Sequence, residues 1–115
     1  MDFAFVIEYV PDVDAARRFY EAVLGLKAQR YAPNFVQYDH FALTSDEPLG
    51  GKDEPELYWV VDDVEAALRE LSAKAEVAMP LKQLPFGKVF AVKDPAGRPR
   101  YVLEWAAQRP SQTVD

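Results

Sequence analysis

The first half of the chain changes from a strand pattern to a helix pattern and back again. Residues 3–10 form an apolar, aromatic-rich run of strand length. A helix is expected to begin after Asp12, a residue type that caps helices, and to end at Gly25. Its apolar positions recur at helical spacing and are Val13, Ala16, Tyr20, Val23 and Leu24. Three short strands are expected next, at residues 26–31, 35–38 and 41–44.

The second half repeats this order. Segment 63–69 (DVEAALR) matches segment 12–18 (DVDAARR) at an offset of 51 residues, which indicates one duplicated unit rather than a solenoid. The second helix has its apolar positions at Val64, Ala67, Leu68, Leu71 and Ala75. The strands expected around it are residues 56–61, 77–84, 88–93 and 100–106.

These patterns predict an α+β fold in which two βαβββ modules form a cup-shaped, eight-stranded mixed sheet with one helix per module. We expect a single domain. Its parts are module 1 at 1–45, a polar linker rich in Pro and Gly at 46–55, module 2 at 56–107 and a tail at 108–115. One helix covers one face of each four-stranded unit, which leaves the other face for a ligand pocket or a subunit contact.

Charge and composition narrow the range of partners. Thirteen basic and nineteen acidic residues give a net charge of −6, which argues against nucleic-acid binding because phosphate neutralisation needs a basic face. No apolar run approaches the ~18 residues of a membrane span, so we expect a soluble, cytoplasmic protein without a membrane partner. The aromatic content of 13% suits either the stacking of a flat or cationic ligand or an apolar dimer interface.

Metal chemistry is restricted by two residue types. The chain has no cysteine and a single histidine, His40, which lies in an expected turn. Thiolate sites, and sites that need two histidines from one chain, are therefore excluded.

Several motifs are spread over nearly the whole chain: YVPDV at 9–13, FY at 19–20, LGL at 24–26, VDDV at 61–64 and DPAG at 94–97. Together they are similar to those of the vicinal oxygen chelate superfamily, which includes glyoxalases, extradiol dioxygenases, fosfomycin-modifying enzymes and bleomycin-resistance proteins. The resemblance implies the fold predicted above. It does not imply one reaction, because this fold supports several chemistries.

In metal-using members of that superfamily, ligands come from the first and last strands of each module. By this resemblance the first-strand positions are Phe5 and Glu56, and the last-strand position of module 1 is Ala42. The fourth position falls at Tyr101 by strict counting, or at Glu104 if the preceding hairpin is longer than usual.

We favour Glu104 for the fourth position. Tyr101, Leu103 and Trp105 would then face the helix, since the side chains of a strand alternate between its two faces. The opposite register would bury Glu104 beneath the helix, where an unpaired carboxylate is costly.

Phe5 and Ala42 cannot ligate a metal, and two carboxylates alone would hold a divalent ion weakly. We therefore expect no metal cofactor, although a divalent ion at Glu56 and Glu104 is not excluded. The favoured function is a metal-independent small-molecule-binding protein that sequesters an aromatic or cationic ligand as a homodimer. An antibiotic-resistance role is implied only by the resemblance to bleomycin-resistance proteins. The expected ligand-binding residues are Phe5, Tyr9, Glu56, Tyr58 and Glu104.

Two other functions remain open at this point. One is a metal-dependent lyase, isomerase or dioxygenase that uses Glu56 and Glu104. The other is a non-catalytic module whose open face serves only for dimerisation.

Overall fold

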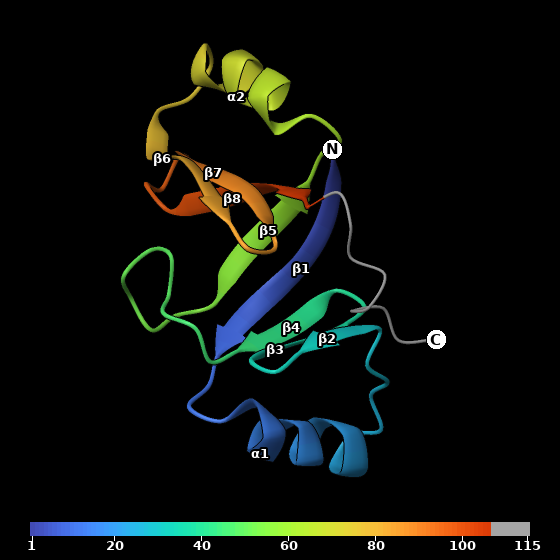
Figure 1. The fold of residues 1–115 in the computed structure, drawn as a ribbon. Coiled ribbons are helices and arrows are strands. Elements are labelled where there is room, and N and C mark those ends of the chain that lie inside the picture. The colour runs from blue at the N-terminus through green and yellow to red at the C-terminus, as the bar shows by residue number, and fades with distance from the viewer. Residues whose placement is uncertain (107–115) are drawn as a thin grey trace. The chain divides into compact units, whose positions relative to one another are not determined.

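The computed structural model describes residues 1–106 of the 115-residue chain, and the expected tail at 108–115 lies outside the described residues. The first module runs through β1 (Asp2–Tyr9), α1 (Val13–Arg17), its continuation η1 (Arg18–Val23), β2 (Arg30–Ala32), β3 (Phe35–Tyr38) and β4 (Phe41–Thr44). The second runs through β5 (Glu56–Val60), α2 (Val64–Ser72), β6 (Val77–Leu84), β7 (Gly87–Lys93) and β8 (Pro99–Trp105) (Figure 1).

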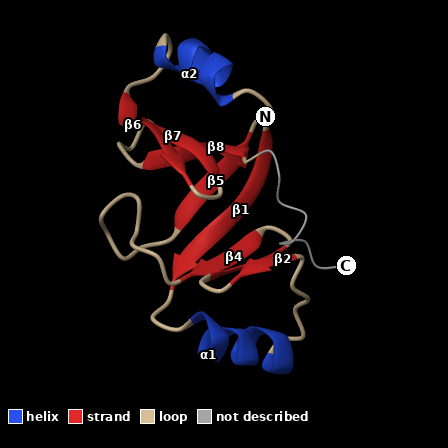
Figure 2. Ribbon diagram, viewed as in Figure 1, coloured by secondary structure: helices blue, strands red, loops and turns tan. Residues whose placement is uncertain are grey.

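This element order confirms the α+β class and the two βαβββ modules, each with one helical region (Figure 2). The chain forms two compact units. Among the described residues, one unit, here called the N-unit, comprises residues 5–55, and the other, the C-unit, comprises residues 1–4 and 56–106. None of the helices in residues 1–106 is long and apolar enough to cross a membrane.

Each unit mixes parallel and antiparallel pairing. In the N-unit the strand order is β2-β3-β4-β1, with β1 parallel to β4 and the other pairs antiparallel. In the C-unit the order is β5-β8-β7-β6, with β5 parallel to β8 and the other pairs antiparallel. In both units the first and last strands of a module are therefore neighbours, which brings their side chains together on each face of the sheet.

The helical segment of the N-unit changes its hydrogen bonding after Arg17. The amide of Leu24 donates to the carbonyl oxygen of Phe19 at 3.2 Å, a bond between residues five apart, so η1 is π-helical. This wider turn rotates the following side chains relative to a regular α-helix. Val23 and Leu24 are consequently 68% and 55% exposed. The prediction that they continue the apolar face of the helix is therefore wrong. The expected inward positions earlier in the segment, Val13, Ala16 and Tyr20, are confirmed in the core cluster with Val36, Tyr38 and Leu43.

Glu21 ties this segment to the sheet. Its Oε2 accepts a hydrogen bond from Arg17 Nε at 2.6 Å and another from the Tyr38 hydroxyl at 2.8 Å. The bond from Arg17 lowers the pKa of Glu21, while burial, together with the neighbouring carboxylate, raises the pKa of Tyr38. The Tyr38 hydroxyl therefore stays protonated as a donor and fixes the helix above β3.

In the C-unit α2 packs over β7 and β8. Asp63 caps the helix by accepting a hydrogen bond from the amide of Ala66 at 3.0 Å. Val64 is buried with Phe90 and Val102, and the expected positions Ala67, Leu68 and Leu71 pack against this cluster.

Gly87 allows β7 to approach β8. Its φ is +157°, and a Cβ at this position would overlap with the backbone oxygen of Glu104 and lie 3.1 Å from Leu103 Cδ1. Gly87 pairs with Trp105 at the end of the β7–β8 ladder, so a side chain here would push the two strands apart.

We expect Gly87→Ala to lower the free energy of unfolding by about 1–3 kcal/mol, because the clash involves backbone that cannot move without breaking the ladder. Gly97→Ala is the matched control, since Gly97 also has a positive φ (+83°) but has nothing within 4 Å of its would-be Cβ. Urea denaturation measures both variants. Equal losses for the two would show that the close approach at Gly87 does not limit stability.

Candidate functional site

The pairing of β8 with β5 determines which side chains of these strands share a face. Tyr58 lies opposite Tyr101, and Trp59 lies opposite Val102. Val102 is buried in the α2 cluster, so Tyr101 lies on the other face of the sheet. Leu103 continues this alternation and Trp105 follows Tyr101, so the expected register, with Tyr101, Leu103 and Trp105 facing the helix, is wrong.

The hairpin before β8 explains the register. Asp94 Oδ1 accepts hydrogen bonds from the amides of Ala96 and Arg98, both at 2.9 Å, and Gly97 adopts a φ of +83°. Lys93 is then already paired with Pro99. The hairpin is therefore not longer than usual. The position obtained by strict counting from the helix motif, Tyr101, is the one that faces away from α2.

Glu104 lies on the α2 side of β8. The prediction that it faces the ligand, on the opposite side of the sheet, is wrong. Its Oε1 accepts a hydrogen bond from the amide of Val64, the first residue of α2, at 3.0 Å. The first amides of a helix lack partners within the helix, and a negative charge near them is favourable. Glu104 therefore pairs with the start of α2 rather than lying beneath the helix unpaired.

We expect Glu104→Ala to lower the free energy of unfolding by about 1 kcal/mol, the usual effect of removing a capping acceptor. Glu104→Gln should lose less, because an acceptor remains. The control is Glu70→Ala, which removes an exposed carboxylate near Lys74. Thermal and urea unfolding of the three variants provide the comparison. A Glu104→Ala variant as stable as Glu70→Ala would contradict this role.

On the face opposite α2, Glu56, Tyr58 and Tyr101 form one cluster, here called the Glu56 cluster. Their exposed fractions are 4%, 2% and 1%. The Tyr58 hydroxyl lies 3.4 Å from Glu56 Oε1, and the Tyr101 hydroxyl lies 3.3 Å from Oε2, each as a donor. The two rings stack, with centroids 5.0 Å apart and planes at 20°.

Glu56 and Tyr58 lie together as the sequence predicts, but the expected third residue, Glu104, is wrong, and Tyr101 lies beside Glu56 instead. The Glu56 cluster combines a buried carboxylate with two aromatic rings whose hydroxyls meet its oxygens. An acidic group flanked by aromatic faces is chemically suited to an organic cation.

The other expected binding residues, Phe5 and Tyr9, belong to the N-unit. Ile7 lies opposite Ala42, so Phe5 and Tyr9 share a face with Ala42, away from the α1 core. Phe5 is 2% exposed, with its ring centroid 6.1 Å from that of Phe35. The Tyr9 hydroxyl accepts a hydrogen bond from the amide of Leu49 at 3.5 Å.

The residues at the four positions that supply metal ligands in the resembling superfamily do not fit a transition metal here. They are Phe5, Ala42, Glu56 and Tyr101, which provide one carboxylate and one phenol that is hydrogen-bonded to it. Within residues 1–106, no group of three or more His, Cys, Asp or Glu side chains is placed to hold a metal ion. His40 is exposed in the β3–β4 turn, as expected.

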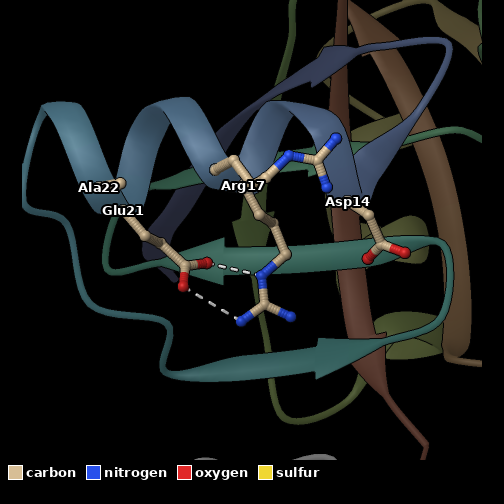
Figure 3. Close-up of a pocket in the computed structure, with 5 residues that line it drawn as sticks. Asp14, Arg17, Glu21 and Ala22 are labelled. Atoms are coloured by element: carbon tan, nitrogen blue, oxygen red, sulfur yellow. Dashed lines mark hydrogen bonds and ion pairs between the residues drawn. The ribbon is translucent and has the colours of Figure 1, made fainter.

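A hollow of about 460 Å³ lies beside α1 and is lined by Asp14, Arg17, Arg18, Glu21 and Ala22. Figure 3 shows the side chains of Arg17 and Glu21 pointing toward one another, as their hydrogen bonds require. The Arg17 guanidinium also lies 4.9 Å from the centroid of the Tyr31 ring. These contacts hold the helix on the sheet, and we assign the hollow a structural role.

Comparison with solved structures finds the same fold in several bacterial proteins. A structure described as an NAD-dependent benzaldehyde dehydrogenase from Legionella pneumophila aligns with a TM-score of 0.74 and 21% identity, over 89% of this chain and 98% of the other. A glyoxalase/bleomycin resistance protein/dioxygenase superfamily member from Vibrio splendidus aligns with a TM-score of 0.62 and 19% identity, over 88% and 97%. Methylmalonyl-CoA epimerase from Mycobacterium tuberculosis aligns with a TM-score of 0.65 and 18% identity, over 91% and 88%.

No curated protein matches the chain in sequence. A family model does match, over residues 3–98, and this range includes α1, α2 and β5, the strand that carries Glu56 and Tyr58. The chain belongs to the Glyoxalase/Bleomycin resistance protein/Dioxygenase superfamily.

Proposed function

We propose that this protein is a metal-independent small-molecule-binding protein of its superfamily, which captures an aromatic organic cation through the Glu56 cluster. The observation that carries the proposal is that the 4%-exposed carboxylate of Glu56 is hydrogen-bonded to two stacked tyrosines, Tyr58 and Tyr101. Glu56 and Tyr101 occupy two of the four positions that supply metal ligands in metal-using members of the superfamily. Charge attraction is stronger in such a buried setting than in water.

The metal-dependent alternative relied on Glu56 and Glu104 acting as a pair. Glu104 lies on the other face of the sheet and accepts the hydrogen bond from Val64. The pair of carboxylates on which that alternative rested is therefore not formed, and the oxygens of Glu56 instead accept hydrogen bonds from the hydroxyls of Tyr58 and Tyr101. This donor set supports capture of a ligand rather than coordination of an ion.

We also propose that the protein acts as a homodimer. Phe19, Val23 and Leu24 on the α1–η1 segment are 48%, 68% and 55% exposed. Three neighbouring apolar side chains on one short segment support an apolar contact with a second copy.

N-methylquinolinium, a flat aromatic cation, tests the capture proposal against quinoline, which is neutral at pH 7.5. We expect the cation to bind about tenfold more tightly than quinoline, a difference of ~1.4 kcal/mol. Glu56→Gln should abolish this preference, because the amide keeps the shape and loses the charge. Tyr58→Ala should weaken both probes by removing a stacking face. Isothermal titration calorimetry measures the affinities.

Glu70→Gln is the matched control, since it removes one exposed carboxylate elsewhere in the C-unit. Its preference for the cation should equal that of the wild type. A preference that survives in Glu56→Gln, or that is lost equally in Glu70→Gln, would overturn capture by the Glu56 cluster.

A further inference from the structure

Gln37, on β3 of the N-unit, carries an unusual polar atom. Its Nε2 donates a hydrogen bond to the backbone oxygen of Asp39 at 2.9 Å, and this bond fixes which way the amide points. Its Oε1 is buried and accepts no hydrogen bond from any of the described residues. Buried polar atoms in proteins are nearly always hydrogen-bonded, so such an acceptor calls for a donor from outside the chain.

The position of Gln37 in the sheet defines its surroundings. Its neighbours along the strand, Val36 and Tyr38, belong to the α1 core, so Gln37 lies on the opposite face. On one side it pairs with Ala42, whose methyl group offers no competing polar atom. On the other side it pairs with Arg30 of β2.

Arg30 gives this face a positive charge. Burial lowers the pKa of its guanidinium, which reflects the removal of part of its hydration. A guanidinium has five N–H donors, so it can serve a ligand in addition to its other contacts. Carboxylates match this donor geometry and form strong, charge-assisted hydrogen bonds with it.

Apolar rings complete the same face. Phe35 is two residues from Gln37 on β3 and therefore shares its side of the sheet, and the ring centroid of Phe5 lies 6.1 Å from that of Phe35. The face thus presents, in one row, a cation and a buried acceptor, with aromatic side chains beside them.

We propose that Arg30 and Gln37 form a binding subsite for an organic carboxylate that carries an O–H or N–H donor on the adjacent carbon. The carboxylate accepts hydrogen bonds from Arg30, and the adjacent donor bonds to Gln37 Oε1. Directly paired residues have Cβ atoms about 5 Å apart, a span that two groups on neighbouring carbons can bridge. This subsite is additional to the proposed function, because its residues lie in the N-unit and recognise the opposite charge.

Mandelate, phenylacetate and O-methylmandelate test the subsite, since they share a ring and a carboxylate and differ at the α position. Mandelate has a hydroxyl donor, phenylacetate has none, and O-methylmandelate keeps the oxygen without its hydrogen. We expect mandelate to bind about tenfold more tightly than either of the others, the effect of one hydrogen bond to a buried acceptor. Amide chemical shifts in two-dimensional NMR titrations report the affinities and the residues affected.

Two variants separate the contributions of the subsite. Gln37→Leu should remove the preference for mandelate while leaving phenylacetate binding nearly unchanged, and Arg30→Met should weaken all three probes together. Gln83→Leu, on the exposed part of β6, is the matched control and should behave as the wild type. The dispersion of the amide spectrum verifies that each variant is folded.

Equal binding of mandelate and phenylacetate to the wild type would overturn the subsite, as would an absence of binding by all three probes. A mandelate preference that persists in folded Gln37→Leu would overturn it as well. A crystal structure of the mandelate-soaked protein in which only a water contacts Gln37 Oε1 would have the same consequence. The subsite and the Glu56 cluster can fail separately, because Glu56→Gln should retain the mandelate-to-phenylacetate ratio and Gln37→Leu should retain the preference for N-methylquinolinium.

Discussion

The pairing of Tyr58 with Tyr101 across β5 and β8 sets the chemistry of both faces of the C-unit. Strand side chains alternate with a period of two, so a shift of one residue would exchange every side chain of β8 between the faces. In the observed register Tyr101 joins Glu56, and Glu104 meets the first amide of α2. The closed turn at Asp94–Gly97 and the approach allowed by Gly87 hold this register from the two ends of β8.

Much of the fold could be predicted from the sequence because local signals agreed with each other. Asp12 accepts a hydrogen bond from the amide three residues later, as its position before a helical pattern indicated, and Asp63 does the same at the second copy of the motif. The strands at residues 35–38, 41–44 and 77–84 have the bounds expected from their apolar patterns. The repeated motif placed both helices, and the family match confirms the superfamily that the motifs indicated.

The predictions were wrong where the orientation of a side chain depends on a contact distant in the sequence or on an irregular helical hydrogen bond. The sequence predicts Glu104 on the ligand side because an unpaired carboxylate beneath the helix would be costly, yet the partner of Glu104 is the backbone amide of Val64, 40 residues away. Val23 and Leu24 fit a regular helical period, and the bond from Leu24 to Phe19 breaks that period. Of the two alternatives for the fourth position, strict counting from the helix motif gives Tyr101, which is the residue that lies beside Glu56. Gln37 gave no signal in the sequence, because its importance comes from an acceptor that only the three-dimensional arrangement leaves without a donor.

The two units present different chemistry on the faces away from their helices. The C-unit offers a buried carboxylate with two tyrosines, and the N-unit offers a guanidinium beside a buried amide oxygen. Neither set contains the imidazole or thiolate groups that favour transition metals.

Anomalous diffraction from crystals grown with Mn²⁺ tests the central claim, that Glu56 is a hydrogen-bonded recognition carboxylate rather than a metal ligand. We predict no anomalous peak within bonding distance of Glu56, with the hydroxyls of Tyr58 and Tyr101 still at hydrogen-bond distance from its two oxygens. A manganese ion bound to Glu56, with either hydroxyl turned away from the carboxylate, would contradict the claim.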